Sequence, residues 1–223
     1  MDILGIIGSC RKSGNTDLLV RKALEGAEAQ GFRTRAVMLS DYAIADCTGC
    51  EGCRHGLRCV VDDGMQELYP LLEQARGLVI GSPTYFYNVS GIMKNFLDRL
   101  YCQEFFNSEN RSVWLGLHEV AGIKYAVTVA VCEQERVEDM GFTSEALARS
   151  LAAVGYRVVD RVEALHAFAR GEVRNRSGIL DKARLAGERL ALTLNLHNRV
   201  KGMLETAQNR TPGAKKKDPA KKA

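Results

Sequence analysis

The fold is decided near the amino terminus by Asp2-Ile-Leu-Gly-Ile-Ile-Gly8-Ser-Cys-Arg-Lys-Ser-Gly-Asn-Thr16. A short apolar run ends at Gly8, a loop rich in glycine and hydroxyl groups follows, and a helical pattern starts at about Thr16. Such a strand–loop–helix junction directs unpaired backbone N–H groups and the positive end of the helix dipole toward one point, which is a site for phosphate. The side chains predicted to help are Ser9, Arg11, Ser13, Asn15 and Thr16.

Strand and helix patterns alternate along the rest of the chain, which predicts an α/β fold with a parallel sheet covered on both faces. Helices are expected at about 16–30, after Asp62 or Asp63 as N-cap, after Ser90, from Thr143 to Gly155, and from Gly178 to about Val200. The five expected strands suit the doubly wound order 2-1-3-4-5. They span residues 2–7, 33–39, 77–80, 124–131 and 156–162.

Two stretches, Cys47–Asp62 and about 105–122, are predicted to be irregular. One domain is expected over residues 1–206, followed by a disordered basic tail over 207–223. The whole chain of 223 residues has a net charge of +4, but the tail carries six basic residues against one acidic residue. The body is therefore slightly acidic, and we expect no specific nucleic acid partner. No stretch is apolar enough to span a bilayer, so the protein is expected in the cytoplasm.

A second loop is predicted at the end of the third strand, in Gly81-Ser82-Pro83-Thr84-Tyr85-Phe86-Tyr87-Asn88. The first and third strands are neighbours in a 2-1-3 sheet, and ligands bind at the crevice where their carboxyl ends meet. Aromatic side chains on a loop stiffened by proline can pack on a flat ring system. The predicted ring-binding residues are Pro83, Thr84, Tyr85, Phe86 and Asn88.

The first loop lacks the lysine of a P-loop and the glycine spacing of a dinucleotide fingerprint. It resembles the phosphate loop of the FMN reductase branch of flavodoxin-like proteins, as the Ser-Pro-x-Tyr segment resembles that family's flavin loop. Cys10 departs from the family pattern, because relatives often have proline there. The resemblance covers roughly residues 1–160 and implies a flavodoxin-like fold that binds FMN. No acid–base pair or nucleophile is then required, because the flavin carries the chemistry.

The cysteine loop reads Cys47-Thr-Gly-Cys50-Glu-Gly-Cys53-Arg-His-Gly-Leu-Arg-Cys59. Structural zinc usually takes two separated pairs of ligands, whereas three cysteines in immediate x₂ succession match the way ferredoxins wrap a cubane. Cys47, Cys50, Cys53 and Cys59 are therefore the predicted metal ligands. Cys102 and Cys132 have no partners at such spacing and are expected to be buried apolar residues.

This loop resembles the cysteine motif of the iron–sulfur flavoproteins, a subgroup of the same family. The resemblance implies a 4Fe–4S cluster beside FMN and a homo-oligomer, either dimer or tetramer. Electrons would then come from a ferredoxin-like donor and leave to dioxygen, peroxide or a quinone. The first alternative is an NAD(P)H-dependent FMN or quinone reductase that holds no cluster, and the second is a non-enzymatic electron carrier or redox sensor.

Overall fold

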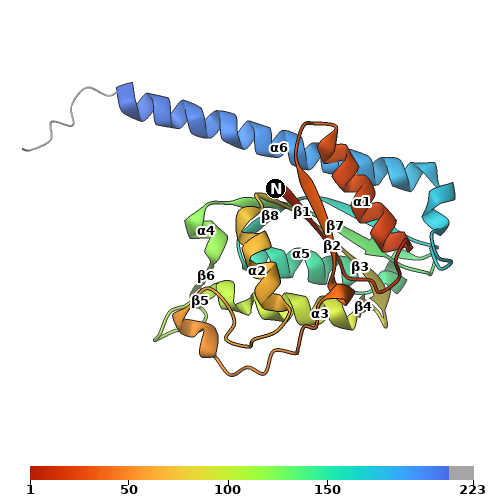
Figure 1. Ribbon diagram of the computed structural model, residues 1–223, viewed down its shortest axis with the longest axis horizontal. Coiled ribbons are helices and arrows are strands. Elements are labelled where there is room, and N and C mark those ends of the chain that lie inside the picture. The colour runs from red at the N-terminus through yellow and green to blue at the C-terminus, as the bar shows by residue number, and fades with distance from the viewer. Residues whose placement is uncertain (211–223) are drawn as a thin grey trace, which may run out of the picture.

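A five-stranded parallel sheet forms the centre of the protein in the computed structural model, which describes residues 1–210 without the side chains of His55, Asn209 and Arg210 (Figure 1). The strand order is β2-β1-β3-β7-β8. This order confirms the prediction of a flavodoxin-like, doubly wound sheet. The strands are β1 (Ile3–Ile7), β2 (Thr34–Met38), β3 (Gly77–Tyr85), β7 (Lys124–Val131) and β8 (Tyr156–Ala164).

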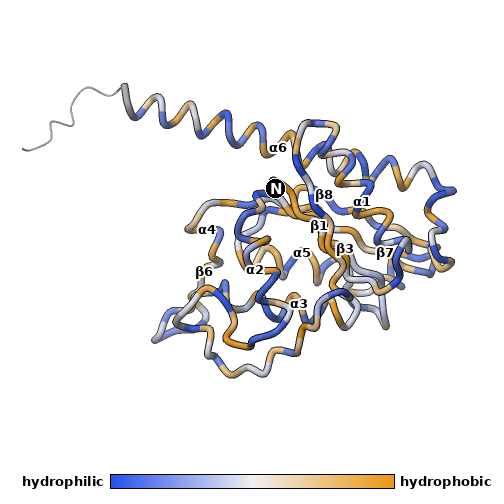
Figure 2. The backbone as a smooth tube through the Cα atoms, viewed as in Figure 1, coloured by the Kyte–Doolittle hydropathy of each residue, from blue (hydrophilic) through white to orange (hydrophobic). Residues whose placement is uncertain are grey.

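Helices cover both faces of this sheet because its strands are apolar on both sides. Ile3 and Ile7 of β1 pack in the core with α1 (Asn15–Glu28) and α6 (Ser177–Arg210). Leu4 and Ile6, which alternate with them, pack on the opposite face. That face is covered by α2 (Met65–Gln74), α3 (Gly91–Asp98) and α5 (Thr143–Ala153). Figure 2 shows the apolar strands enclosed between these helices.

Two glycines let α1 and α6 touch through their backbones. A Cβ atom on Gly26 would lie 2.0 Å from the carbonyl oxygen of Arg184, and one on Gly187 would lie 1.7 Å from that of Ala23. Any side chain at either position would force the helices apart. The close approach keeps α1, and with it the loop that precedes it, in a fixed place against the sheet.

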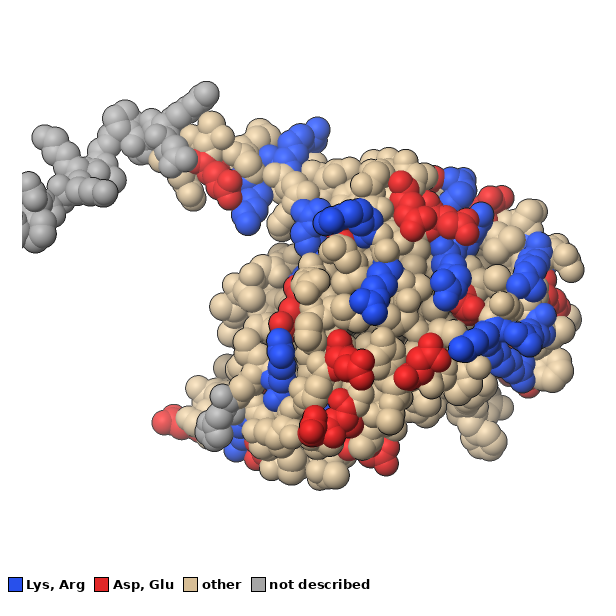
Figure 3. Space-filling model, viewed as in Figure 1, with Lys and Arg blue, Asp and Glu red and all other residues tan. Residues whose placement is uncertain are grey.

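Helix α6 is longer than predicted, because it continues from Ser177 to Arg210. Its carboxyl-terminal part projects beyond the body and carries charges of both signs (Figure 3). The first four residues of the predicted disordered tail, Ala207–Arg210, belong to this helix, and the rest of the tail lies outside the described residues. Within residues 1–210, no helix combines the length and apolar character needed to cross a membrane.

The prediction of an irregular stretch at about 105–122 is wrong. Strands β5 (Glu104–Phe106) and β6 (Trp114–Gly116) form an antiparallel hairpin, and α4 (Leu117–Ala121) follows directly. Three-residue strands and a five-residue helix are too short to show a period in the sequence. Similarly, β3 extends beyond its expected end because it pairs with β4 (Asn88–Val89).

Helices α3 and α2 begin at or next to the residues predicted as their N-caps. Ser90 caps α3, since its hydroxyl oxygen accepts a hydrogen bond from the N–H of Met93 at 3.4 Å. At α2 the N-cap position belongs to Gly64, but the carboxylate of Asp63 accepts from the N–H of Met65 at 3.0 Å. The cysteine loop lies between β2 and α2, as expected.

Candidate functional site

The loops that follow β1, β3, β7 and β8 surround a cavity of about 310 Å³ at the carboxyl edge of the sheet. The fold thus unites the two loops that the sequence marked separately. Eight of the ten predicted cofactor residues line the cavity, namely Ser9, Arg11, Asn15, Thr16, Pro83, Thr84, Tyr85 and Phe86. The remaining walls are Val131, Glu133, Ala167 and Phe168.

The first loop presents backbone N–H groups at the start of α1. Gly8 is tied to β3 by the hydrogen bond from its N–H to the carbonyl of Gly81 at 2.8 Å. The first N–H groups of α1, from Asn15 onward, have no intrahelical partner, as at the start of any helix. Within the described chain, Gly14, at the N-cap position, provides no side-chain hydrogen bond to them. Since Asn15 and Thr16 line the cavity, an anion there meets both these donors and the helix dipole.

Ser13 shapes this loop from outside the cavity. Its backbone is left-handed, with a φ of 56°, and its N–H donates to the carboxylate of Asp17 at 2.7 Å. Asp17 in turn accepts from the guanidinium of Arg21 at 2.6 Å. The Ser13 side chain faces a neighbouring hollow instead, which it shares with Lys12 and Arg35.

The Asn15 side chain ties α1 to the segment after β8. Its amide nitrogen donates to the carbonyls of Ala167 at 3.0 Å and Ala169 at 2.9 Å, and its oxygen accepts from the N–H of Val173 at 3.2 Å. Both hydrogens of the amide are used in these bonds. The side chain therefore positions one wall of the cavity, and only the backbone N–H of Asn15 is left to meet a ligand.

Arg11 extends along the same wall. Its guanidinium donates to the carbonyl of Phe168 at 3.3 Å and lies 5.9 Å from the centre of the Phe168 ring. Within the described chain it forms no ion pair with a carboxylate. Its positive charge is therefore available to an anion in the cavity.

The turn between β3 and β4 carries two aromatic residues in the left-handed region. Phe86 and Tyr87 have φ angles of 52° and 65°, as a two-residue type I′ hairpin requires, although glycine or asparagine usually occupies such positions. Bulky residues there cost of order 1–3 kcal/mol each, and such strain concentrates at functional sites. The N–H of Phe142 holds the turn through the carbonyl of Tyr87 at 2.7 Å.

This turn leaves Phe86 99% exposed at the cavity, an unusual position for a large apolar ring. Beneath it, the buried hydroxyl oxygen of Thr84 finds no hydrogen-bond partner among residues 1–210. Asn88 lies outside the cavity, and its side-chain oxygen accepts from the N–H of Val89 at 2.8 Å. An exposed ring beside an unpartnered hydroxyl suits a flat ligand with polar edges.

Four wall residues were missed by sequence reasoning, because they carry no motif. Val131 and Glu133 come at and after the end of β7, and Ala167 and Phe168 follow β8. The available signal was topological, since carboxyl ends of parallel strands share one edge. Glu133 adds an acidic residue to a lining that also contains Arg11.

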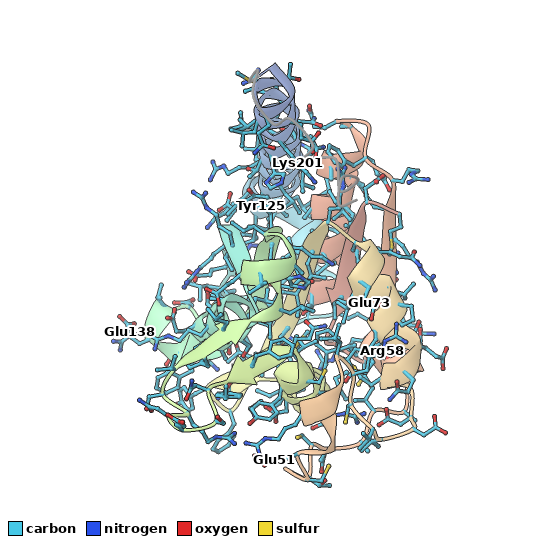
Figure 4. The ribbon with its side chains drawn as sticks, turned by 90° about the vertical axis from the view of Figure 1, so that its left-hand side faces the viewer. Glu51, Arg58, Glu73, Tyr125, Glu138 and Lys201 are labelled. Carbon is cyan, nitrogen blue, oxygen red and sulfur yellow. The ribbon has the colours of Figure 1, made fainter. Side chains whose placement is uncertain are left out.

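The cysteine loop is less enclosed than this cavity. The thiols of Cys47 and Cys50 are exposed, those of Cys53 and Cys59 are half-buried, and all four are free. Sulfur atoms lie near Glu51 at the edge of the molecule in Figure 4. Within the described chain, no three His, Cys, Asp or Glu side chains converge closely enough to hold a metal ion. The structure therefore gathers the predicted ligands in one loop but does not assemble a closed metal site.

The thiols nevertheless affect one another. Burial raises the pKa of Cys53, and the charges of Cys59, Cys47 and Cys50 raise it further. The pKa of Cys50 is lowered by hydrogen bonds from the Gly52 N–H and the Thr48 hydroxyl. The four cysteines are thus electrostatic neighbours, and these hydrogen bonds make the exposed Cys50 thiol easier to ionise than an ordinary cysteine.

Contacts at its sides hold this loop. The Arg58 guanidinium makes a two-pronged ion pair with Glu73 of α2, at 2.7 and 2.9 Å, and the two side chains lie beside each other in Figure 4. The amide of Gln66 donates to the carbonyls of Cys59 and Val61, both at 2.7 Å. Cys59 is consequently the most firmly anchored of the four predicted ligands.

The β5–β6 hairpin adds another contact to the cysteine loop, because Arg111 donates to Glu51 at 3.0 Å and to the Tyr101 hydroxyl at 2.6 Å.

Cys102 and Cys132 are buried, as predicted. Burial raises the pKa of the Cys102 thiol to about 11. Cys102 nonetheless shares a hollow of about 290 Å³ with Cys53, which sequence spacing did not indicate.

Comparisons with known sequences agree with this geometry. The family model described as NADPH-dependent FMN reductase matches residues 1–131. An iron-sulfur flavoprotein of Methanocaldococcus jannaschii is 38% identical over 99 residues, which cover 44% of this chain and 51% of that protein. One from Archaeoglobus fulgidus is 40% identical over 100 residues, covering 45% and 46%. A putative NAD(P)H-dependent FMN-containing oxidoreductase of Bacillus subtilis is 33% identical over 99 residues, covering 44% and 51%.

The chain spans about half the length of these relatives. Solved structures share the fold at low sequence identity. A flavone reductase matches with a TM-score of 0.64 at 18% identity, covering 86% of this chain and 62% of the other. RosB, solved with a bound flavin intermediate, matches with a TM-score of 0.65 at 14% identity, covering 100% and 94%. The sequence match over more than half of its length shows that the chain belongs to the NADPH-dependent FMN reductase family.

Proposed function

We propose that this protein is an FMN-dependent oxidoreductase of the iron–sulfur flavoprotein type. The observation that carries the proposal is the cavity of about 310 Å³, which joins an uncapped helix start to an exposed, strained aromatic turn. One end of this cavity suits a phosphate and the other suits a flat ring, and FMN contains both groups.

The residues at the phosphate end fit a dianion. The Arg11 guanidinium, the Ser9 and Thr16 hydroxyls and the first N–H groups of α1 are donors around one point, and the helix dipole adds to their positive potential. The chain offers one such loop and no dinucleotide fingerprint, which favours FMN over FAD.

The residues at the other end fit an isoalloxazine. Tyr85 and Phe86 would flank the ring, and the unpartnered Thr84 hydroxyl would satisfy its hydrogen bond on a polar edge of the ring. When bound, FMN supplies one- and two-electron redox chemistry. The protein's own work is to hold the ring, to limit its contact with water and to leave the face beside Glu133 open to a small acceptor.

The cysteine loop supplies the donor set for a 4Fe–4S cluster. Cys47, Cys50, Cys53 and Cys59 are free thiols on one loop, and relatives over the first half of the chain are named iron-sulfur flavoproteins. Since the described side chains do not converge on a metal position, we infer that the loop draws inward when the cluster is assembled. A ferredoxin-like donor would supply electrons, and dioxygen, peroxide or a quinone would accept them.

A reductase without a cluster is the second candidate. The open cysteine loop favours it, as do the family's NADPH dependence and the likeness to an NAD(P)H-dependent oxidoreductase. In that case NAD(P)H delivers hydride directly to the flavin, and the cysteines are not ligands. The free thiols suit a reducing cytoplasm under either proposal, and the exposed leucines Leu192 and Leu196 on α6 support a homo-oligomer.

The test is the content of iron, sulfide and FMN in protein purified anaerobically, together with its visible spectrum. Near-stoichiometric FMN is expected, with about four iron and four sulfide per FMN and a broad absorbance beneath the flavin bands. Flavin with negligible iron and sulfide after reconstitution would establish the second candidate. Absence of any flavin after incubation with FMN would refute both.

A further inference from the structure

Arg99 is a buried cation beneath the cysteine loop. It begins the five-residue 3₁₀ helix Arg99–Gln103 after α3, and its side chain is 0% exposed. Arginine is almost never fully buried unless its charge is paired, because removing a cation from water is expensive. Its surroundings therefore need to account for its position.

The guanidinium contacts both ends of the cysteine loop at once. On the leading side, its Nη1 donates to the carbonyl of Ala45 at 2.9 Å. On the trailing side, Nη2 donates to the carbonyl of Val61 at 3.4 Å. The carboxylate of Asp63 accepts from Nη1 at 2.6 Å and from Nη2 at 3.1 Å. These partners stand just before Cys47 and just after Cys59, so one side chain closes the base of the loop.

The loop is also joined to the backbone of Arg99 through Tyr69. The Tyr69 hydroxyl donates to the Arg99 carbonyl at 2.8 Å and accepts from the N–H of Cys59 at 3.4 Å. Asp63 accepts a further hydrogen bond from the N–H of Ala45 at 2.9 Å, which repeats the link between the two ends. The closure of the loop is therefore built from several bonds that all meet at Arg99 and Asp63.

One nitrogen of the Arg99 guanidinium takes no part in these hydrogen bonds. Among residues 1–210, its Nε finds no hydrogen-bond partner although it is buried. A buried donor without a partner loses its hydrogen bond to water and gains none in exchange, so such groups are rare in folded proteins. Burial alone would lower the pKa of Arg99, but the hydrogen bonds of Asp63 and the charge of Cys59 raise it above its ordinary value. The guanidinium charge thus lies against the backbone at both ends of the cysteine loop, where Asp63 pairs it.

We propose that Arg99 is the positioning residue of the iron–sulfur site, where it closes the base of the cysteine loop and places a fixed positive charge at the carbonyl of Val61, two residues after Cys59. This inference rests on the proposed function. A cluster held by these cysteines would gain one negative charge on accepting an electron from the proposed ferredoxin-like donor, so a fixed cation nearby would stabilise its reduced form and raise its reduction potential. Asp63 offsets part of that charge and lowers the potential.

The test uses charge changes of opposite sign on the same pair. Arg99→Met removes the cation, and Asp63→Asn removes its counter-ion while keeping the shape of the carboxylate. The cluster's potential is measured by anaerobic redox titration with EPR detection. Each variant is expected to shift the reduction equilibrium at least tenfold, about 59 mV for one electron. Arg99→Met should lower the potential and Asp63→Asn should raise it.

Two further variants, together with iron release and FMN content, separate the effect of charge from an effect on folding. Arg99→Lys keeps the charge but lacks the planar fork, so its potential should stay near that of the wild type while iron is released faster to a chelator. Arg33→Met, which breaks the remote surface pair with Asp2, should change neither property. FMN content reports the integrity of the fold. If Arg99→Met loses its flavin, Asp63→Asn and Arg99→Lys still carry the test.

The outcomes are distinct. Potentials of Arg99→Met and Asp63→Asn that move in the same direction, or not at all, overturn the assignment of Arg99 while the cluster itself stands. Wild-type protein that binds FMN but assembles no iron and sulfide overturns the cluster and this inference together. Opposite shifts with retained flavin establish it, because a merely structural role would not reverse sign between the two variants.

Discussion

The flavin cavity is framed by loops that hydrogen bonds hold in place, whereas the cysteine loop of the same fold leaves two of its thiols exposed. The cavity is framed by loops that start at buried strand ends, and each loop is tied by bonds such as that of Asn15 with Ala167. The cysteine loop is bonded at its base and sides, whereas the thiols of Cys47 and Cys50 stay exposed. A parallel sheet can prepare a binding site before the ligand arrives, whereas a ligand loop between elements depends on the ligand to complete it.

Among the variants that test this difference, Cys59→Ala is expected to have the largest effect. If the loop needs all four thiolates, the variant should lose most of its iron and sulfide, or hold an oxygen-labile remnant, while FMN stays bound in its separate cavity. Reduction by a ferredoxin-type donor should fall sharply, and direct reduction by NAD(P)H should persist. Iron, sulfide and FMN are assayed in reconstituted protein. Cys132→Ala, which removes a buried thiol elsewhere, serves as control. Full iron content in Cys59→Ala would contradict the ligand assignment.

The reciprocal change is made in the cavity. Arg11→Ala combined with Thr16→Val removes two donors from the phosphate end, each worth about 1.5 kcal/mol to a charged acceptor. The dissociation constant for FMN should rise about 100-fold without unfolding the chain. Flavin fluorescence titration measures the affinity, and thermal unfolding checks the fold. Lys22→Ala, on the exposed side of α1, should bind FMN normally. Unchanged affinity in the double variant would remove the phosphate assignment.

Asn15→Ala tests whether the cavity is preorganised by its own bonds. Three hydrogen bonds to the 167–173 segment are lost, and buried backbone groups stay without partners. The free energy of unfolding should fall by about 3 kcal/mol. Urea denaturation measures this loss, with Asn198→Ala, which loses one exposed bond to Arg76, as the comparison. Equal stability of the two variants would show that the wall is held by packing alone.

Acid should destabilise the protein through the buried imidazole of His118. Burial lowers the pKa of His118 in α4 to about 4, below the ordinary histidine value of about 6.5. Between these values the folded state binds fewer protons than the unfolded state, so stability is complete above pH 6.5 and falls as the pH drops. The loss should reach about 2 kcal/mol from pH 6.5 to 5.

Urea unfolding across this range provides the measurement. His118→Phe keeps the packing on the Tyr156 ring, at 4.8 Å between ring centres, and should flatten the pH dependence. His166→Gln, at an exposed position, should retain it. If His118→Phe and the wild type lose stability in parallel, another group is responsible.

The smallest effect is expected at the contact between the hairpin and the cysteine loop. Arg111→Ala breaks an exposed ion pair with Glu51, so stability should change by less than about 1 kcal/mol. Thiol alkylation in the cluster-free protein should nevertheless become about threefold faster, since the hairpin no longer restrains the loop. The control is Arg136→Ala, which breaks the exposed pair with Glu138 outside the cysteine loop. Equal alkylation rates would show that the hairpin leaves the loop unrestrained.

The sequence by itself determined which segments form the strands of the sheet, the place of the cysteine loop and most of the cavity residues, whereas the strand order was only the one that such strands suit. Strands such as Ile3–Ile7 are buried on both faces and are therefore continuously apolar, which is the pattern by which a strand of a covered parallel sheet is recognised. The phosphate loop and the aromatic loop could be recognised in the sequence because each consists of residues that follow one another in the chain. Eight of the ten predicted residues meet at one cavity for that reason.

Only the tertiary structure decided the remaining parts. Glu133 and Phe168 reach the cavity from strands far apart in sequence, and Asn15 exchanges its expected ligand contact for bonds to residues more than 150 positions away. Arg99 closes the cysteine loop from 36 residues beyond Asp63. Such long-range polar contacts leave no periodic trace, because a buried charge or amide takes whichever partner the folded backbone brings within hydrogen-bonding distance.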